Sequence, residues 1–266
     1  MGGLFWVGIV LCAVGVILFF VQRQQHRHAR SLKLARTATV AELQSLAREI
    51  AGEIGGGSWR DYVKLTGIVR CDRPLQSELK QEACVHYEMR VSREYEEKVT
   101  RRDSDGNTRR ETQRGSEVVA QNQRSLTFWL EDQTGQSEVN PDGAKIATVK
   151  ILDEFQAEQG VDHQVSYGKF SRTVKRAGGD RRTLGYRYHE AILPVDQRVL
   201  VVGMISDSSG SLLVQKPLQP EQRFIISLKD DEALTKSADS SAKVALYSMV
   251  VSFAVGSLLL VLSVLL

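Results

Sequence analysis

The sequence predicts a mainly β protein, a small β-barrel or sandwich with an OB-like barrel as one of its forms, with a long hairpin arm and two flanking transmembrane helices. Three observations predict this fold class. Uncharged apolar runs lie near the two ends of the chain, short alternating apolar segments fill the region between them, and one long polar segment with a central Asp-Gly interrupts those segments. About 180 to 200 residues remain once the runs and the juxtamembrane segments are set aside, enough for one sizeable core or two small ones.

The apolar runs, residues 4–21 and 244–266, predict membrane spans. As helices rising about 1.5 Å per residue they would be roughly 27 and 34 Å long, close to or above the ~30 Å hydrocarbon core of a bilayer. No basic segment precedes the first run and no small-x-small site follows Val21, so we expect an anchor and not a cleaved signal peptide. The expected location is a membrane crossed twice, with the lipid bilayer as a partner.

Charge predicts the orientation of the region between the spans. The outer flanks of both runs carry no Lys or Arg. Five basic residues follow the first run: Arg23, Arg27, Arg30, Lys33 and Arg36. Because Lys and Arg resist translocation, we expect the main domain to lie on the cytoplasmic side.

Small residues recur along each predicted span. The stripes are Gly8, Cys12 and Gly15 in the first span and Ser248, Ser252 and Gly256 in the second. In lipid, such stripes let helix backbones approach closely. They predict packing of the two helices, either within one chain or across a homo-oligomer.

Three segments separate the spans. Residues 22–57 predict a basic juxtamembrane segment and a short amphipathic helix, which begins at the capping-box pattern Thr39-Val40-Ala41-Glu42 and stops at Gly52. Residues 58–228 form the expected β domain, and residues 229–243 a linker.

Alternating or buried-looking apolar segments predict the strands of the β domain. They are Val63 to Val69, Val85 to Val91, Leu126 to Leu130, Tyr186 to Leu193, Val199 to Ile205, Leu212 to Val214 and Phe224 to Ile226. Ile151 to Gln159 is compatible with a strand or a short helix. Many short strands joined by Gly, Asp and Ser turns favour a barrel or sandwich.

The polar segment, residues 92–123, predicts a hairpin arm because Asp105-Gly106 is a strong turn signal. The alternative is a disordered loop. Its mixed charge is typical of a solvated surface, and it also offers candidate partner-binding residues: Arg101, Arg102, Arg109 and Arg110.

The motifs that would indicate catalysis or metal binding are missing. The five histidines and three cysteines form no HExxH or paired CxxC spacing, and no phosphate loop or Gly-x-Ser-x-Gly elbow occurs. Cys84 and His86 would share one face of a strand, which allows a nucleophile or, as we favour, a packed cysteine beside a hydrogen-bonded histidine. A disulfide between Cys71 and Cys84 stays open. We expect no catalytic residues, no cofactor and no metal.

Several short segments, in this order, resemble a known family. They are Thr66 to Leu75, Cys84 to Tyr87, Phe128 to Gly135, Asn140 to Ala144, Leu193 to Val195, Val201 to Gly203, Gln215 to Pro217 and Phe224 to Ser227. Together they resemble the GIDE-type, or beside-a-membrane, domain of the MULAN-type ubiquitin ligases of mitochondria and plastid envelopes and of their bacterial homologues.

The resemblance implies a domain held beside a membrane. Eukaryotic members carry a RING after the second span, which binds two zinc ions and recruits the ubiquitin-charged enzyme. This sequence reaches only Leu266 after its second run. The expectation is therefore a RING-less, bacterial, inner-membrane member that is not itself an enzyme. Eukaryotic members place this domain between two membranes, whereas charge places it here in the cytoplasm.

The residues and the resemblance agree on a membrane-anchored scaffold that binds an unidentified protein. One alternative is a ubiquitin-ligase-related component that acts with a separate catalytic subunit. Another is a barrel that binds anionic lipid or nucleic acid through the basic stretch Lys169, Arg172, Lys175, Arg176, Arg181 and Arg182. Because the net charge is only +3 and this stretch holds one aromatic residue, we interpret it as a solvated loop and expect no nucleic-acid partner.

Overall fold

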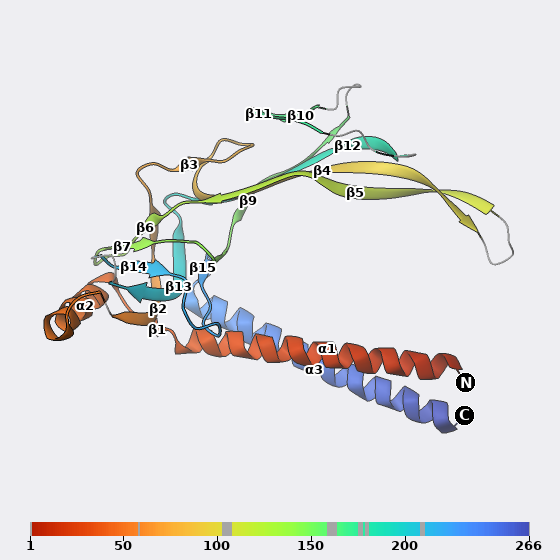
Figure 1. The fold of residues 1–266 in the computed structure, drawn as a ribbon, viewed down its shortest axis with the longest axis horizontal. Coiled ribbons are helices and arrows are strands. Elements are labelled where there is room, and N and C mark those ends of the chain that lie inside the picture. Colours follow the sequence, from red (N-terminus) through yellow and green to blue (C-terminus); the bar gives the residue numbers. More distant parts are fainter. Residues whose placement is uncertain are drawn as a thin grey trace. The chain divides into compact units, whose positions relative to one another are not determined.

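The computed structural model describes residues 2–57, 59–102, 108–158, 164–174, 178, 181–207 and 211–265. It is mainly β, as the sequence predicts (Figure 1). The chain forms two compact units. The first comprises residues 1–67, 130–145 and 198–266, and the second comprises residues 68–129 and 146–197.

The first unit is built on an eight-stranded sheet in the order β1-β2-β6-β7-β14-β13-β15-β8. An additional pairing of β2 with β13 closes five of these strands into a barrel, which confirms the predicted barrel. Five is also the strand number of an OB-fold. The strands are β1 (Arg36–Thr37), β2 (Arg60–Arg70), β6 (Phe128–Glu131), β7 (Gln136–Val139), β8 (Lys145–Ile146), β13 (Arg198–Ser206), β14 (Leu213–Gln215) and β15 (Ile225–Ser227).

Strand β13 is the most buried strand of this barrel, since every residue from Val199 to Ser206 is buried. Successive side chains of a strand point to opposite faces. On one face, Leu200 and Val202 form a cluster with Leu32 and Ala35, which lie at the end of the first helix. A strand buried on both faces needs a near-continuous apolar run, and Val199 to Ile205 supplies one.

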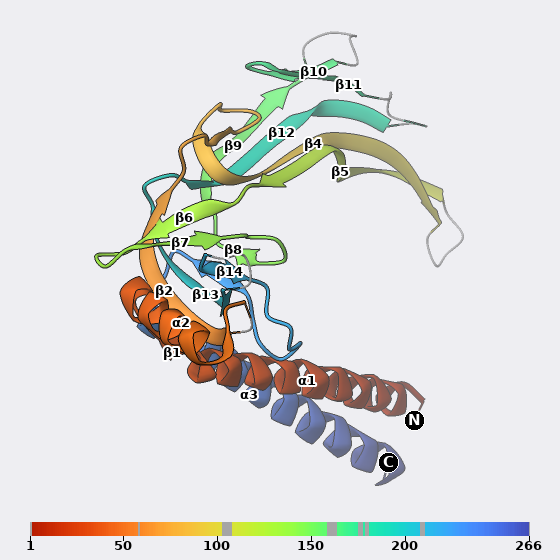
Figure 2. The same ribbon diagram turned by 60° about the vertical axis from the view of Figure 1, so that its left-hand side comes forward.

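Two long helices, α1 (Gly2–Leu34) and α3 (Asp231–Leu265), contain the apolar runs of the sequence. They lie side by side in both views (Figures 1 and 2). Their prediction as membrane spans is not supported, because within the described part of the chain no helix has both the length and the apolar character needed to cross a bilayer. The helices also extend beyond the runs, so residues 231–243, expected as a linker, are helical.

Polar contacts fix the inner ends of both helices to the barrel. The Tyr62 hydroxyl lies 2.9 Å from Ser31 Oγ and donates to the Arg223 carbonyl at 2.9 Å. Lys64, only 6% exposed, pairs with Asp231 at 2.6 Å. Buried charges are costly unless they are paired. These contacts, together with the packing of Leu234 on the Leu32 cluster, explain why helix continues where a linker was expected.

The amphipathic helix α2 (Val40–Ile54) begins as the sequence predicts, with a complete capping box between Thr39 and Glu42. It ends two residues later than predicted and is followed by Gly55, whose φ of 87° favours glycine. Asp132 Oδ2 accepts from Val40 N at 2.8 Å. Burial raises the pKa of Asp132, but hydrogen bonds from Thr134, Val40 and Gly135 outweigh it and leave that pKa below its usual value. An ionised Asp132 therefore stabilises the start of α2.

The second unit is an antiparallel sheet in the order β3-β4-β12-β9, with β5 paired to β4 (Figure 2). Its strands are β3 (Leu75–Gln76), β4 (Ala83–Arg102), β5 (Thr108–Ser125), β9 (Val149–Ala157) and β12 (Arg181–Pro194). The ambiguous segment from Ile151 is therefore a strand. Arg181 and Arg182, which we interpreted as loop residues, begin β12, whereas Lys175 and Arg176 lie outside the described residues.

One face of this sheet is buried. Met89, Val91, Tyr186 and Tyr188 form its core with Leu79, Ala120, Leu152, Val165 and Val174. A separate hairpin of β10 (Gln164–Tyr167) and β11 (Phe170–Thr173) packs there, and Tyr188 donates to the Ser166 carbonyl at 3.0 Å. The buried face therefore faces a hairpin and not solvent.

The loop that joins β3 to β4 is held by one buried carboxylate. Glu190 on β12 is fully buried and accepts hydrogen bonds from Ser77 Oγ at 3.0 Å, Leu79 N at 2.7 Å and Lys80 N at 2.8 Å. Within the loop, Ser77 N donates to the Glu82 carbonyl at 2.9 Å. Because buried charges need such donors, the loop and Glu190 depend on each other.

Candidate functional site

The predicted arm, residues 92–123, is a hairpin and not a disordered loop. Strands β4 and β5 pair along their length, from His86↔Ser125 to Arg102↔Thr108, with one register shift at Val91/Ser92. Among the described residues, the pairing of β12 with β4 reaches only Arg181↔Glu97, so there residues 98–102 and 108–112 form a two-stranded end. The predicted Asp105-Gly106 turn lies outside the described residues.

The four candidate partner-binding arginines all lie in this two-stranded end. The register places Arg101 opposite Arg109, and Arg110 opposite Thr100. Arg110 is exposed, whereas the side chains of Arg101, Arg102 and Arg109 lie outside the described residues. Like charges at opposing strand positions destabilise a hairpin. The two-stranded end therefore keeps a basic character at a cost to its own stability.

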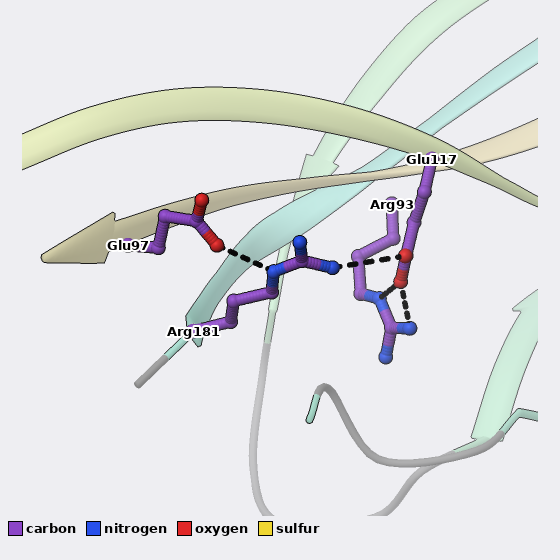
Figure 3. Close-up of polar contacts among 4 residues, drawn as sticks. All are labelled: Arg93, Glu97, Glu117 and Arg181. Carbon is purple, nitrogen blue, oxygen red and sulfur yellow. Dashed lines mark hydrogen bonds and ion pairs between the residues drawn. The ribbon is translucent and has the colours of Figure 1, made fainter. Parts of the chain in front are cut away.

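A charged cluster braces the arm where β12 begins (Figure 3). Arg93 is 7% exposed and its Nε lies 2.6 Å from Glu117 Oε1. Arg181 Nε lies 2.6 Å from Glu97 Oε2, and Arg181 Nη1 lies 3.6 Å from Glu117 Oε2. The hydrogen bond to Glu97 raises the pKa of Arg181. Ion pairs thus replace the apolar core on this face of β4, beyond Met89 and Val91.

An aromatic ring completes the brace. The Arg181 guanidinium carbon lies 4.5 Å from the centre of the Tyr95 ring, within cation–π range. The register places Tyr95 opposite Gly115, where an added Cβ would lie 2.6 Å from the ring. Glycine at this position lets Tyr95 lie across β5. The ring therefore covers the β5 backbone at Gly115, which has no side chain of its own.

The opposite face of the sheet carries a second row of charges. Arg187 bonds Glu94 at 2.8 Å and Asp153 at 3.3 Å, and Lys150 bonds Asp153 at 3.1 Å. The hydrogen bonds from Lys150 and Arg187 lower the pKa of Asp153. This face is therefore polar and exposed across β4, β12 and β9.

A hollow of about 410 Å³ lies on the sheet near the end of β5, where Gln121 and Gln123 pair with Arg90 and Glu88 of β4. It is lined by Glu88, Met89, Arg90, Gln121, Asn122, Gln123 and His189. The register places His189, Arg90 and Gln121 in one row across β12, β4 and β5. Its polar lining suits a peptide or a polar side chain better than an apolar ligand.

Cys84 and His86 are packed residues and show no sign of a nucleophile. His86 Nδ1 lies 2.8 Å from Ser125 Oγ, and burial lowers the pKa of His86. Burial, with the charge of Glu190, raises the pKa of Cys84 to about 11. A nucleophilic cysteine needs the opposite shift. Cys71 and Cys84 are both free thiols, and no group of three or more His, Cys, Asp or Glu side chains in the described ranges could hold a metal.

We expect Cys84 to react with iodoacetamide far more slowly than the half-buried Cys71 at pH 8. With a pKa of about 11, only about one Cys84 thiol in a thousand is ionised at that pH, and burial blocks access to it. Timed alkylation followed by peptide mass spectrometry measures both rates. Urea should bring the two rates together, and equal rates in the folded protein would contradict this interpretation of Cys84.

The candidate helix-packing residues are placed only in part. Gly15 is buried in α1, and a Cβ added there would lie 3.1 Å from the Phe253 ring of α3. In α3, Gly256 is buried, Ser252 is half-buried and Ser248 is exposed. The surroundings of Gly8 and of the Cys12 side chain lie outside what the structure describes. Direct contact between the two small-residue stripes stays a prediction.

Sequence reasoning missed the cluster of Arg93, Glu117 and Arg181. A signal was present, because Arg93 continues the buried stripe of Met89 and Val91 at a spacing of two residues. A charge in such a stripe indicates a buried ion pair. Its partners could not be found in this way, since the register of β4 with β5 shifts at Val91/Ser92.

Comparison with known proteins adds one finding. The model of the GIDE family, described as E3 Ubiquitin ligase, matches residues 96–262, which is more than half of the chain. The matched region includes most of the arm, the barrel strands that follow it and most of α3. No curated protein and no solved structure matches the chain. The family resemblance noted in the sequence is thereby confirmed: the chain belongs to the GIDE family.

Proposed function

We propose that the chain is a membrane-anchored scaffold that binds a protein partner through its arm and performs no chemistry of its own. The observation that carries this proposal is the two-stranded end of the arm, residues 98–102 and 108–112. It extends past β12, carries the four candidate arginines, and is braced at its base by the Arg93 cluster. A braced, charged projection is suited to contacting another macromolecule.

The charges of the arm favour an acidic partner surface. Near the base, the acidic residues Glu94, Glu96, Glu97 and Glu117 each pair with an arginine. Toward the tip, Arg110 is exposed, and its side chain forms no hydrogen bond or ion pair with another described residue. Complementary charge steers association and fixes orientation. The tip, and not the base, therefore supplies the attraction.

The anchoring part of the proposal rests on the sequence. Residues 4–21 and 244–266 are apolar and uncharged, and the basic residues that follow the first run favour a cytoplasmic domain. Both runs lie in helices whose inner ends are bonded to the barrel. We propose a two-pass protein of a bacterial inner membrane, with an unidentified protein partner and with homo-oligomers through the helices as a further possibility to be tested.

The family description favours a second candidate, a component of ubiquitin-type transfer that acts with a separate catalytic subunit. The described residues hold no group of metal-ligating side chains of the kind a RING requires. In this candidate the arm binds the catalytic subunit. A partner that itself carries paired Cys and His metal ligands would distinguish it from the scaffold.

Crosslinking in intact cells, followed by mass spectrometry, tests the scaffold proposal. A photoreactive residue at the exposed position Thr112 should capture one recurring protein. A shortened arm, with residues 99–111 replaced by a short Gly-rich turn, should reduce that capture about tenfold because the basic tip is removed. Separation of membrane from soluble fractions in the same cells tests the anchoring.

A matched variant controls for charge. Arg101, Arg102, Arg109 and Arg110 changed together to lysine keep the charge and should retain most of the capture, whereas the same four changed to serine should not. The shortened arm keeps Arg93, Glu97 and Glu117, so its unfolding transition should stay near that of the parent. Undiminished capture by a folded, shortened arm would refute the proposal.

A further inference from the structure

The outer edge of β5 offers a second kind of binding surface. Of the described strands, β4 alone pairs with β5. In an antiparallel ladder, the N–H and C=O groups of alternate residues point away from the partner strand. An edge strand 18 residues long therefore presents a row of unpaired backbone donors and acceptors, a ready template for another strand.

The hollow described above lies over β12, β4 and β5 and so reaches this edge strand. Three of its lining residues, Gln121, Asn122 and Gln123, belong to β5 itself. The side chains of Arg90, Gln121, Gln123 and His189 form no hydrogen bond or ion pair with any described residue. Four polar side chains that meet in one hollow without protein partners are suited to receiving groups from a ligand.

Charge selects the kind of strand that this edge accepts. Strand β5 carries four arginines against two glutamates, and Glu117 is already paired with Arg93 and Arg181. The strand is therefore basic, which disfavours pairing with a second copy of itself. Opposite charges on facing strand positions are favourable.

We propose that the outer edge of β5 binds an extended, acidic segment of a partner protein by strand addition. Backbone hydrogen bonds to β5 give the affinity, and side chains of the added strand enter the hollow beside Gln121 and continue the row of His189 and Arg90. This inference rests on the proposed function, because it gives the chemistry and the binding mode of the partner that the arm serves.

Model peptides test the binding mode on the purified full chain. The probe is an eight-residue peptide of alternating Glu and Val, with capped ends, and its binding is measured by fluorescence anisotropy. Methylation of all its backbone nitrogens removes the donors that strand addition needs, so it should weaken binding about tenfold or more. An unmethylated Lys-Val peptide of the same length should bind more weakly than the methylated Glu-Val peptide.

Hydrogen exchange supplies the second readout. The Glu-Val peptide should slow the exchange of alternate amides of β5, while amides of the edge strand β9 stay unchanged. Changing Arg110 and Arg114 to glutamine should weaken binding of the peptide, but methylation of the peptide should still reduce the binding that remains. Equal affinity of the methylated peptide, or no binding of either, would overturn strand addition. Protection of β5 without peptide, in a chain of dimeric mass, would also overturn it and assign the edge to a second copy.

The two proposals can fail separately. If the arm captures a partner in cells but that partner leaves the β5 amides unprotected, strand addition is wrong and the scaffold proposal stands. If the peptide binds the edge but no protein is captured in cells, the scaffold proposal fails.

Discussion

Replacing Glu190 by alanine is expected to lower the free energy of unfolding by about 3 kcal/mol or more. The carboxylate is fully buried and accepts three hydrogen bonds, from Ser77, Leu79 and Lys80. Each donor left without an acceptor costs about 1–3 kcal/mol, and the loop can recover part of this by opening to water. Urea unfolding, followed by far-ultraviolet circular dichroism, measures the change.

Two variants sharpen this test. Glu190→Gln keeps the shape and one acceptor oxygen, so it should cost less than the alanine. Glu82→Ala changes an exposed glutamate of the same loop and should alter stability by no more than about 0.5 kcal/mol. If Glu190→Ala is no less stable than Glu82→Ala, the loop is not held by this carboxylate.

The second large effect is expected at the base of the arm. Glu117→Ala should cost about 2 kcal/mol, because it leaves the guanidinium of Arg93, with a side chain 8% exposed, without its main carboxylate. The figure lies below the range for fully buried pairs, since the Glu117 side chain is 34% exposed. The Tyr186 hydroxyl also bonds Arg93 and offsets part of the loss.

The double variant Arg93→Leu with Glu117→Leu gives the informative comparison. Buried ion pairs can often be replaced by apolar residues at little cost, whereas one unpaired charge is costly. The double variant should therefore be more stable than Glu117→Ala, as urea unfolding of the parent and of these two variants would measure. If the double variant is the less stable, the pair itself contributes net stability and the desolvation argument fails here.

The barrel and the arm could be predicted from the sequence because their signals are local. Alternation marks β2 and β4, an apolar run marks β13, and Asp105-Gly106 marks the hairpin. The limits of the helices could not be predicted. Residues 231–243 are polar, which is typical of a linker. Contacts that the sequence does not reveal, such as that of Lys64 with Asp231, make their first turns part of the fold.

The candidate site was predictable only at its tip. Arg101, Arg102, Arg109 and Arg110 flank a turn signal, so their place in the arm follows from sequence order alone. The brace depends on strands far apart in the chain, since Arg181 meets Glu97 across a separation that no local pattern encodes. The free edge of β5 is a property of the sheet order and leaves no mark on the residues of β5.

The unbroken course of β4 from Ala83 to Arg102 has a mechanical consequence. The same strand lies inside the sheet at one end and in the two-stranded end of the arm at the other, with no loop between them. The two-stranded end rises roughly 3.4 Å per residue beyond the last pair with β12, or about 17 Å in all. A pull on the tip would therefore load the β4–β12 ladder in shear, and the arm could not swing away without breaking those hydrogen bonds. The tip is thereby held at a fixed reach from the sheet, as a spacer and not as a tether.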